Sequence, residues 1–270
     1  MEETANILPP TRAVLAIVFS YLIGSIPMGL IVARVAKGVD IREHGSGNIG
    51  LTNVIRTLGW GPGLITGLLD FLKGYLPVLY AMHHFAPQDF GGMNVIYESI
   101  VILVAISIVV GNLYPVYLLF KGGKGVATGF GVLSALMGVY IFIPLAVFGA
   151  ILLIFRFVSL GSIVAAISVP LTVLFLGSKL PVISEDSNTG AGIMIGFTSI
   201  VAILIVWKHR SNISRIFAGT EPRVRSAKES AMPSLSEKLA KQKEPEKKDE
   251  TESDESSQSD EPATKEEEGE

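Results

Sequence analysis

Three short segments combine glycines with the cationic and hydroxyl side chains that bind phosphate. The first, Asp40–Gly59, reads DIREHGSGNIGLTNVIRTLG. Gly45 and Gly47 permit the positive φ angles that turn successive backbone N–H groups towards an anion, and Arg56 is a planar bidentate donor. Uncharged hydrogen-bonding groups come from Ser46, Asn48, Thr52 and Asn53. The pattern is typical of a phosphate cradle, although a polar loop between two helices would contain the same residue types.

The second segment, FKGGKGVAT at Phe120–Thr128, places Lys121 and Lys124 among three glycines. It differs from a Walker loop, because Gly125 stands where Ser or Thr should follow the lysine and the first glycine is missing. A nucleoside triphosphatase is therefore not expected. The two lysines suit either an anion site or simple anchoring of a membrane helix on its cytoplasmic side.

The third segment, KHRSNISRIFAGTE at Lys208–Glu221, follows a long apolar run. His209 and Asn212 are three residues apart and share one face if a helix continues, and Arg215 can join them. A histidine that only reaches the membrane interface is the plain alternative. Considered together, the three segments predict a site for more than one anionic group at the mouth of an apolar bundle. Such a site suits a substrate that is part phosphate and part lipid.

The composition of the 270 residues is that of a membrane protein. Apolar residues make up 49% and charged residues 17%, and the mean hydropathy is +0.48; soluble domains have roughly a quarter of charged residues. No cysteine is present, which excludes disulfides, thiolate nucleophiles, cysteine-ligated zinc and iron–sulfur clusters. The net charge of −3 gives no support to binding of nucleic acid.

Long apolar runs predict an all-α, polytopic membrane fold. Uncharged runs extend over Ala13–Ala33, Ser99–Phe120, Val126–Phe155, Phe157–Ser178 and Thr189–Trp207, and Trp60–Met82 is apolar except for Asp70 and Lys73. As one helix, Val126–Phe155 would extend ~45 Å, too far for one ordinary crossing. We therefore expect two helices there, turning at Gly138 or Pro144, and seven transmembrane helices in all.

The distribution of cations predicts the orientation. With seven spans, all connections rich in Lys and Arg fall on one face, which the positive-inside rule assigns to the cytoplasm. The N-terminus is then outside and the C-terminus cytoplasmic. Six spans would place the basic segment after Trp207 outside. Asp70 and Lys73, inside a span, are expected either to pair on one helix face or to face the polar site.

The last part of the chain differs from the rest. Residues 226–270 contain seven Lys and fifteen Asp or Glu with few apolar residues, so we expect a disordered, solvated cytoplasmic tail. Residues 1–225 form the seven-helix membrane domain. This domain keeps fifteen basic and ten acidic residues.

The three segments resemble the three motifs of the PlsY family of membrane acyltransferases. GSIPMG at Gly24–Gly29, DIREHGSGNIGLTN, LLDFLKG at Leu68–Gly74, FKGGKGVAT and HRSNISRIFAGTE follow that family in order and spacing, from Tyr21 to Glu221. Two positions depart from it: Leu51 stands where the family usually has Ala, and Asn112 where it usually has His. The acidic tail is not part of the family pattern.

The resemblance implies a function. PlsY enzymes transfer an acyl group from acyl phosphate to glycerol 3-phosphate, giving lysophosphatidic acid and phosphate as the first acylation of phospholipid synthesis. They use no metal, coenzyme A or other cofactor. The resemblance further implies seven helices in the lipid bilayer of the bacterial plasma membrane, with the site facing the cytoplasm. It also implies coupling to a soluble enzyme that makes acyl phosphate.

The matching positions imply the roles of individual residues. The phosphate of glycerol 3-phosphate would be held by Ser46, Arg56, Lys124, His209 and Asn212, with Ser46, Lys124 and His209 as the catalytic set. The rest of the polar pocket would be lined by Gly45, Gly47, Asn48, Asn53 and Lys121. Proton removal from the attacking hydroxyl could fall to a substrate phosphate.

Three other functions have partial support in the sequence. The main alternative is a transporter of a phosphorylated anion, which often has an inverted repeat; no convincing repeat is visible. His84 and Asp89 fit the His-x4-Asp string of other acyltransferases, but they lie in a cation-free loop expected outside. A CDP-alcohol phosphotransferase needs clustered metal-binding aspartates, and those of the membrane domain are scattered: Asp40, Asp70, Asp89 and Asp186.

Overall fold

The computed structural model describes residues 9–183 and 188–224, and all regular structure within these ranges is helical. The all-α prediction is confirmed for this part of the chain. The tail predicted at 226–270 and Asp186 lie outside the described residues.

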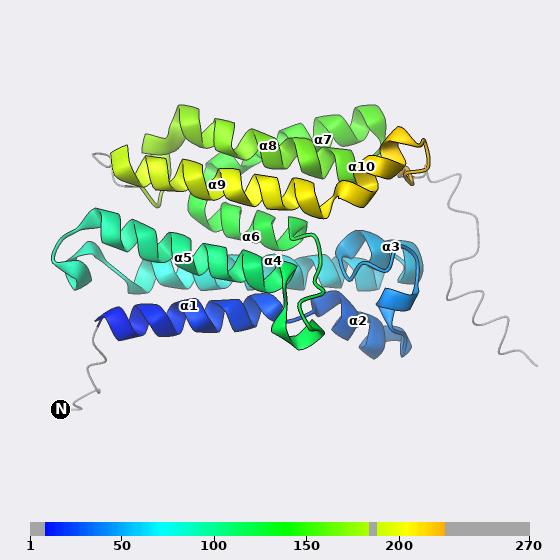
Figure 1. Cartoon of the computed structure of the whole chain (residues 1–270), viewed down its shortest axis with the longest axis horizontal. Coiled ribbons are helices and arrows are strands. Elements are labelled where there is room, and N and C mark those ends of the chain that lie inside the picture. The colour runs from blue at the N-terminus through cyan, green and yellow to red at the C-terminus, as the bar shows by residue number, and fades with distance from the viewer. Residues whose placement is uncertain (1–8, 184–187, 225–270) are drawn as a thin grey trace, which may run out of the picture.

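The long helices run along a common axis (Figure 1). In chain order they are joined by short loops and 3-10 turns. The helices are α1 Pro9–Ser25, α2 Met28–Lys37, α3 Leu51–Leu58, α4 Trp60–His84, α5 Asn94–Leu113, α6 Val126–Met137, α7 Phe142–Phe155, α8 Val158–Leu176, α9 Asn188–Lys208 and α10 Arg210–Phe217. The short helices α2, α3 and α10 gather at one end of the bundle, which we call the site end (Figure 1).

The first expected span is broken. A single helix over Ala13–Ala33 was expected, but α1 ends at Ser25 and α2 leaves at 41° to it. The cause is Pro27, which has no N–H to donate and disfavours helical backbone at Ile26. The break turns α2 away from the axis of α1 and towards the loop that follows it.

The chain reverses within Val126–Phe155. Lys124 donates a hydrogen bond to Asn212 at the site end, and the carbonyl of Arg156 accepts from the N–H of Val224 at the same end (2.8 Å). Between them Gly138, with φ +55°, lies beside Pro181 at the far end of α8. The length argument thus correctly predicted two helices, and the turn lies at Gly138–Ile141 rather than at Pro144.

The lengths and hydropathy of the described helices fit a membrane protein. Five helical stretches are long and apolar enough to cross a membrane, and the bent α1–α2 pair brings the number to six. Val126–Phe155 is counted once among them. The multi-pass prediction is therefore supported at this coarser level.

Glycines bring the central helices into backbone contact. A Cβ at Gly74 of α4 would overlap the carbonyl oxygen of Thr128 in α6, and one at Gly111 of α5 would overlap that of Tyr21 in α1. Small residues allow this close approach between membrane helices. The α4–α6 and α1–α5 pairs therefore form the rigid frame on which the site end is built.

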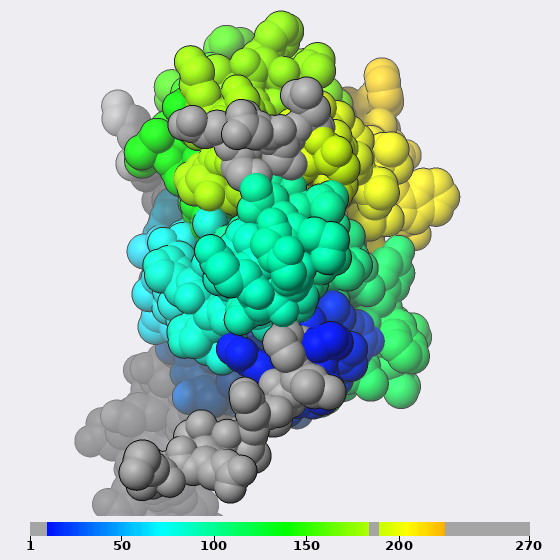
Figure 2. All heavy atoms as spheres, turned by 90° about the vertical axis from the view of Figure 1, so that its left-hand side faces the viewer, coloured from blue at the N-terminus to red at the C-terminus, as the bar shows by residue number. Residues whose placement is uncertain are grey.

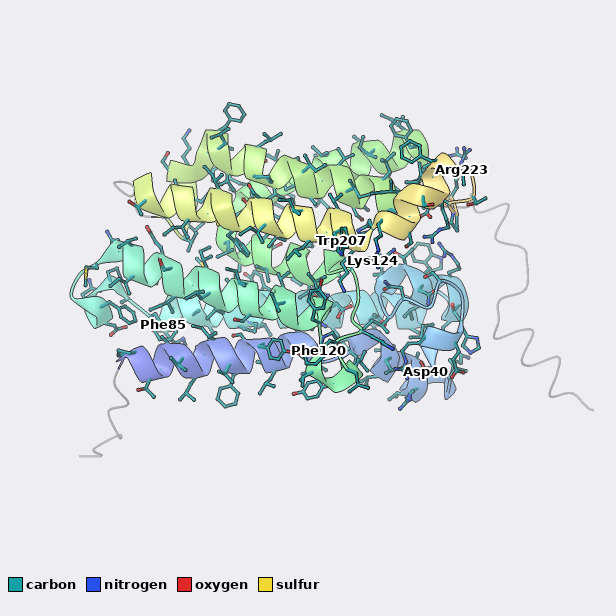
Figure 3. All side chains as sticks on the ribbon, viewed as in Figure 1. Asp40, Phe85, Phe120, Lys124, Trp207 and Arg223 are labelled. Carbon is teal, nitrogen blue, oxygen red and sulfur yellow. The ribbon has the colours of Figure 1, made fainter. Side chains whose placement is uncertain are left out.

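The two ends of the bundle differ in character. Asp40, Lys124 and Arg223 lie towards the site end, whereas Phe85 lies at the opposite end (Figure 3). There Arg12 donates to the carbonyl of His84. Seen from that opposite end, α1 lies against α5, and α9 lies between α5 and α8 (Figure 2).

Candidate functional site

The loop before α3 is shaped by one buried amide. The Nδ2 of Asn53 donates to the carbonyls of Ile41 (3.3 Å), His44 (3.0 Å) and Asn48 (2.8 Å), and its Oδ1 accepts from the N–H of Ser46 (2.8 Å). Asn53 is only 2% exposed. Because its polar atoms bind the loop itself, Asn53 shapes the loop, while Ser46 stays exposed at its tip.

The glycines of this loop are required by its geometry. Gly45 and Gly47 have φ angles of +60° and +70°, which favour glycine. A Cβ at Gly45 would also overlap Oδ1 of Asn53. Asn48 closes the turn by accepting from the N–H of Gly50 (2.8 Å). The positive φ angles that the sequence predicted at Gly45 and Gly47 are therefore present.

A partly buried network joins the second and third segments. Lys124 donates to Oδ1 of Asn212, and Nδ2 of Asn212 donates to Oε1 of Glu221 (2.7 Å). Glu221 also accepts from Oγ of Ser159 (2.7 Å) and from Nε of Arg215 (2.8 Å). The network thus links the loop before α6, the first turn of α8 and the α10 segment.

The environment of Lys124 weakens its hold on a proton. Burial lowers its pKa to about 8; Glu221 opposes this shift, and the positive charges of Arg215 and Arg56 add to it. A phosphate brought to this ammonium would supply the missing negative charge. Because the charge of Arg56 lowers the pKa of Lys124, this arginine of α3 lies within electrostatic range of the lysine.

His209 is buried and neutral. It is 3% exposed, and its Nδ1 lies 2.8 Å from the carbonyl oxygen of Ile205, which can only accept, so Nδ1 carries the proton and Nε2 is an acceptor. Burial lowers its pKa to about 4; the Ile205 carbonyl opposes this shift, Lys124 adds to it and Glu221 opposes it. The imidazole therefore stays uncharged at physiological pH.

Glu221 stays ionised despite its burial. Desolvation alone would raise its pKa, but hydrogen bonds from Ser159, Asn212 and Arg215 outweigh it and the net pKa is lowered. The sequence reasoning did not assign Ser159 or Glu221 to the site. Glu221 had a visible signal, as a lone acid at the end of a cationic motif, whereas Ser159 had none.

The structure brings some of the predicted site residues together. Lys124 and Asn212 are hydrogen-bonded, and Arg56 and His209 lie within electrostatic range of Lys124. The first and second loops meet where a Cβ at Gly123 would be 3.6 Å from the side chain of Ile49. Lys121 is exposed beside Lys124 along the chain.

The His84 and Asp89 pair does not form an acyltransfer site. Nδ1 of His84 contacts the carbonyl of Tyr80 (3.1 Å), and Asp89 accepts from the N–H of Ala86 (2.9 Å). Both residues lie near Phe85, at the end opposite the network (Figure 3). No group of three or more potential metal-ligating side chains occurs in residues 9–183 and 188–224.

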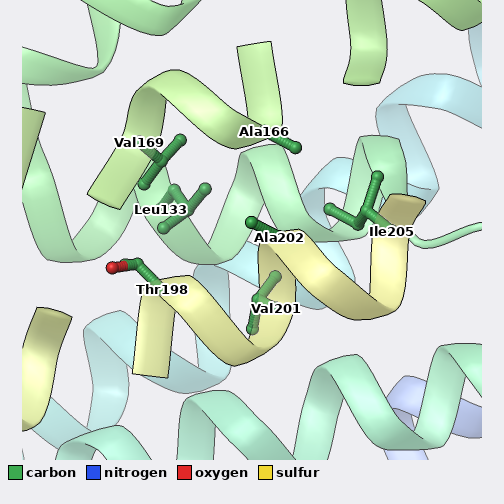
Figure 4. A pocket seen from close by; sticks show the side chains of 7 residues that line it. All are labelled: Leu133, Ala166, Val169, Thr198, Val201, Ala202 and Ile205. Carbon is green, nitrogen blue, oxygen red and sulfur yellow. The ribbon is translucent and has the colours of Figure 1, made fainter. Parts of the chain in front are cut away.

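A small apolar hollow lies between α6, α8 and α9 (Figure 4). It is lined by Leu133, Ala166, Val169, Thr198, Val201, Ala202 and Ile205. The hydroxyl of Thr198 donates to the carbonyl of Met194 (2.8 Å), so the lining is effectively apolar. Ile205, at one edge of the hollow, is one helical turn before His209.

Comparisons with known proteins agree with these features. The sequence model of the family described as glycerol-3-phosphate acyltransferase matches residues 14–219. Relatives of that name from Endomicrobium trichonymphae and Thermosynechococcus vestitus are 43% and 40% identical over 212 and 209 residues. These matches cover 78% and 76% of this chain and 96% and 92% of the relatives.

Two solved structures are also similar. Both are of PlsY (YgiH), an integral membrane glycerol 3-phosphate acyltransferase. Its glycerol 3-phosphate form matches with a TM-score of 0.68 at 36% identity, covering 82% of this chain and 99% of that chain. Its lysophosphatidic acid form matches with a TM-score of 0.65 at 35% identity, covering 85% and 99%. The resemblance seen in the motifs is confirmed: the chain belongs to the glycerol-3-phosphate acyltransferase family.

Proposed function

We propose that this chain transfers a fatty acyl group from acyl phosphate to glycerol 3-phosphate, giving lysophosphatidic acid and inorganic phosphate. The observation that carries the proposal is the partly buried network around Lys124, at the end of an apolar bundle, in a chain of this family. A polar, cationic mouth and an apolar interior fit a substrate with both characters.

The phosphate of glycerol 3-phosphate binds between the two loops in this proposal. Arg56 and Lys124 supply positive charge, the hydroxyl of Ser46 supplies a hydrogen bond, and Gly45 and Gly47 let the loop backbone approach the phosphate. Asn212 completes the set, with Asn48 and Lys121 at the rim, and Nε2 of His209, an acceptor, takes a hydrogen bond from a hydroxyl group of the glycerol. Asn53 acts one step away, because its amide is taken up in holding the loop.

The acyl transfer needs positioning more than activation. The hydroxyl oxygen of glycerol 3-phosphate bonds to the acyl carbon, the carbon–oxygen bond to phosphate breaks, and the hydroxyl proton leaves. Acyl phosphate already has a good leaving group, so the enzyme must hold two anions together through proximity and positive charge.

A substrate phosphate is the better proton acceptor. With a pKa of about 4, His209 is a weak base, whereas a phosphate monoester has a second pKa near 6. The proton of the attacking hydroxyl therefore moves to a phosphate oxygen. His209 stays neutral, and its Nε2 acts only as a hydrogen-bond acceptor.

The apolar bundle receives the acyl chain in this proposal. Each methylene buried against it contributes ~0.8 kcal/mol.

The proposal includes seven crossings. They are α1 with α2, α4, α5, α6, α7, α8 and α9. The cations of the site end then face the cytoplasm by the positive-inside rule, and the N-terminus lies on the other side. A site open to the cytoplasm would admit acyl phosphate from a soluble enzyme that makes it.

An assay with two donors tests the function. Purified protein is given glycerol 3-phosphate with either palmitoyl phosphate or palmitoyl-coenzyme A. We expect lysophosphatidic acid and stoichiometric phosphate from palmitoyl phosphate alone, and no product from Lys124→Ala under the same conditions. Turnover with the coenzyme A thioester alone would contradict the proposed donor.

A further inference from the structure

A buried ion pair lies in α4, away from the network around Lys124. Nζ of Lys73 is 2.8 Å from Oδ1 of Asp70, and their side chains are 2% and 11% exposed. Charged residues inside a membrane span are costly, so they usually have a function. The pairing on one helix face that the sequence allowed is the one found.

The ammonium group of Lys73 has all its donors occupied. Besides Asp70 it donates to the carbonyl oxygen of Ile26 (2.8 Å) and to Oδ1 of Asn112 (2.9 Å). An ammonium has three N–H donors and no acceptor. Three acceptors therefore saturate it, and no donor remains for a substrate.

The hydrogen bond from Lys73 to Ile26 connects the ion pair to the first glycine loop, the loop before α3 that carries Gly45 and Gly47. Ile26 lies in the break between α1 and α2, directly before Pro27. The α2 helix that begins there packs against the loop, because a Cβ at Gly29 would overlap the carbonyl oxygen of Ile49. The position of Ile26 thus determines where the loop with Ser46 lies.

The hydrogen bond from Lys73 to Asn112 connects the ion pair to the second glycine loop, the loop before α6 that carries Gly122 and Gly123. Asn112 is in the last turn of α5, and its carbonyl oxygen accepts from the N–H of Gly123 (3.2 Å). Gly122 lies so close that a Cβ would overlap the same oxygen. Gly123 directly precedes Lys124, so a shift of Asn112 is passed on to the lysine of the network.

We infer that Lys73 is a positioning residue: it ties Ile26 to Asn112 and so fixes the separation of the two glycine loops between which phosphate binds. The inference rests on the proposed function for its catalytic meaning. Asp70 balances the charge and orients the ammonium, and the two loops meet at Ile49 and Gly123.

Spin labels test the separation without any assay of activity. The chain has no cysteine, so Val35→Cys on α2 and Leu119→Cys before Lys121 take both labels; these side chains are 84% and 81% exposed. We expect one narrow distance distribution in the otherwise unchanged chain. In Asp70→Asn/Lys73→Met, which removes both charges together, the distance distribution between the two labels should broaden or shift. Arg12→Met at the opposite end is the control and should leave it unchanged.

Kinetics provide the second measurement. A misplaced loop lowers the population of the reactive geometry, so Asp70→Asn/Lys73→Met should lose about tenfold to a hundredfold in kcat with KM for glycerol 3-phosphate changed less. A value of kcat within about threefold of the unchanged chain, or an unchanged distance distribution, overturns the inference.

A milder variant covers the case in which the double variant does not fold. Asn112→Leu keeps the Asp70–Lys73 pair and removes one link, and it should broaden the same distance distribution. An unchanged distribution there overturns the inference as well. Failure of the unchanged chain to use acyl phosphate would count against the proposed function alone, because the distances do not depend on turnover.

Discussion

Lys124 and Glu221 are joined through a single amide, that of Asn212, which accepts from the lysine and donates to the carboxylate. The opposite charges are therefore one side chain apart instead of in direct contact. Because Arg215 and Ser159 also donate to Glu221, the carboxylate is satisfied without the lysine. In the proposed function, the charge of Lys124 is then left for the phosphate of the substrate.

Glu221→Gln should lower kcat/KM without unfolding the protein. The variant keeps one acceptor oxygen but loses the charge that fixes Asn212 and Arg215, and hydrogen bonds to charged groups contribute about 1.5–3 kcal/mol. We expect a loss of about tenfold or more in steady-state assays. Glu43→Gln, an exposed acid at the same end, is the control and should behave like the unchanged chain.

Removing single phosphate-binding groups should be costly. Ser46→Ala, Arg56→Ala and Lys124→Ala each delete a donor of the proposed cradle, at about 1.5–3 kcal/mol for a charged hydrogen bond. We expect strong losses of kcat/KM with unchanged thermal unfolding. Arg42→Ala, an exposed cation paired with Asp40 (2.6 Å), is the comparison. Near-normal kinetics in all three variants would exclude the cradle.

The dependence of kcat/KM on pH should report Lys124. Its pKa is about 8, and the ammonium form binds phosphate, so kcat/KM should fall as pH rises through about 8. His209, with a pKa of about 4, should add no step between pH 5 and 7. Profiles of the unchanged chain and of Lys124→Arg test this, since arginine stays charged and should remove the fall. An identical fall in both proteins would assign it to another group.

Asn112→His should be close to neutral, whereas Asn112→Leu should lose activity. The role seen for Asn112 is to accept from Lys73 and hold Gly123; a histidine nitrogen can accept the same hydrogen bond, and leucine cannot. Assays with acyl phosphate compare the two variants. A gain of roughly a hundredfold in Asn112→His, the low end of general-base catalysis, would show that a base is missing here.

Topology can be read with two reporters. A reporter at Asp89 should be extracytoplasmic and one directly after Arg225 cytoplasmic, because five proposed crossings lie between them: α5, α6, α7, α8 and α9. Reporters in the loop at Arg42 and in the turn at Arg156 are the internal controls and should read as cytoplasmic. Matching signals at Asp89 and after Arg225 would contradict the seven-span count.

The sequence was most informative where length and chemistry act locally. Thirty apolar residues at Val126–Phe155 are too long for one crossing, so the reversal near Gly138 followed from arithmetic. The break at Pro27 could also have been predicted from the proline itself, but the apolar run on both sides hid it.

The site was less predictable because its geometry depends on long-range contacts. Asn53 was expected to face the substrate pocket, yet its amide binds three carbonyls of the preceding loop, which no spacing rule reveals. Ser159 reaches Glu221 across 62 positions of the chain. Such pairs arise only when α8 and α10 are placed side by side.

The helix pairs α4–α6 and α1–α5 are held by backbone contacts at Gly74 and Gly111. The side chains on the outer surface of the bundle therefore contribute little to these helix contacts. On α4 the opposite face carries exposed Leu64, Leu68 and Leu76, which face outward from the contact with α6. These side chains can be exchanged for others of similar apolarity to suit a thicker, thinner or more fluid bilayer without moving Lys73. The enzyme can therefore be adapted to the lipids of its host independently of its chemistry.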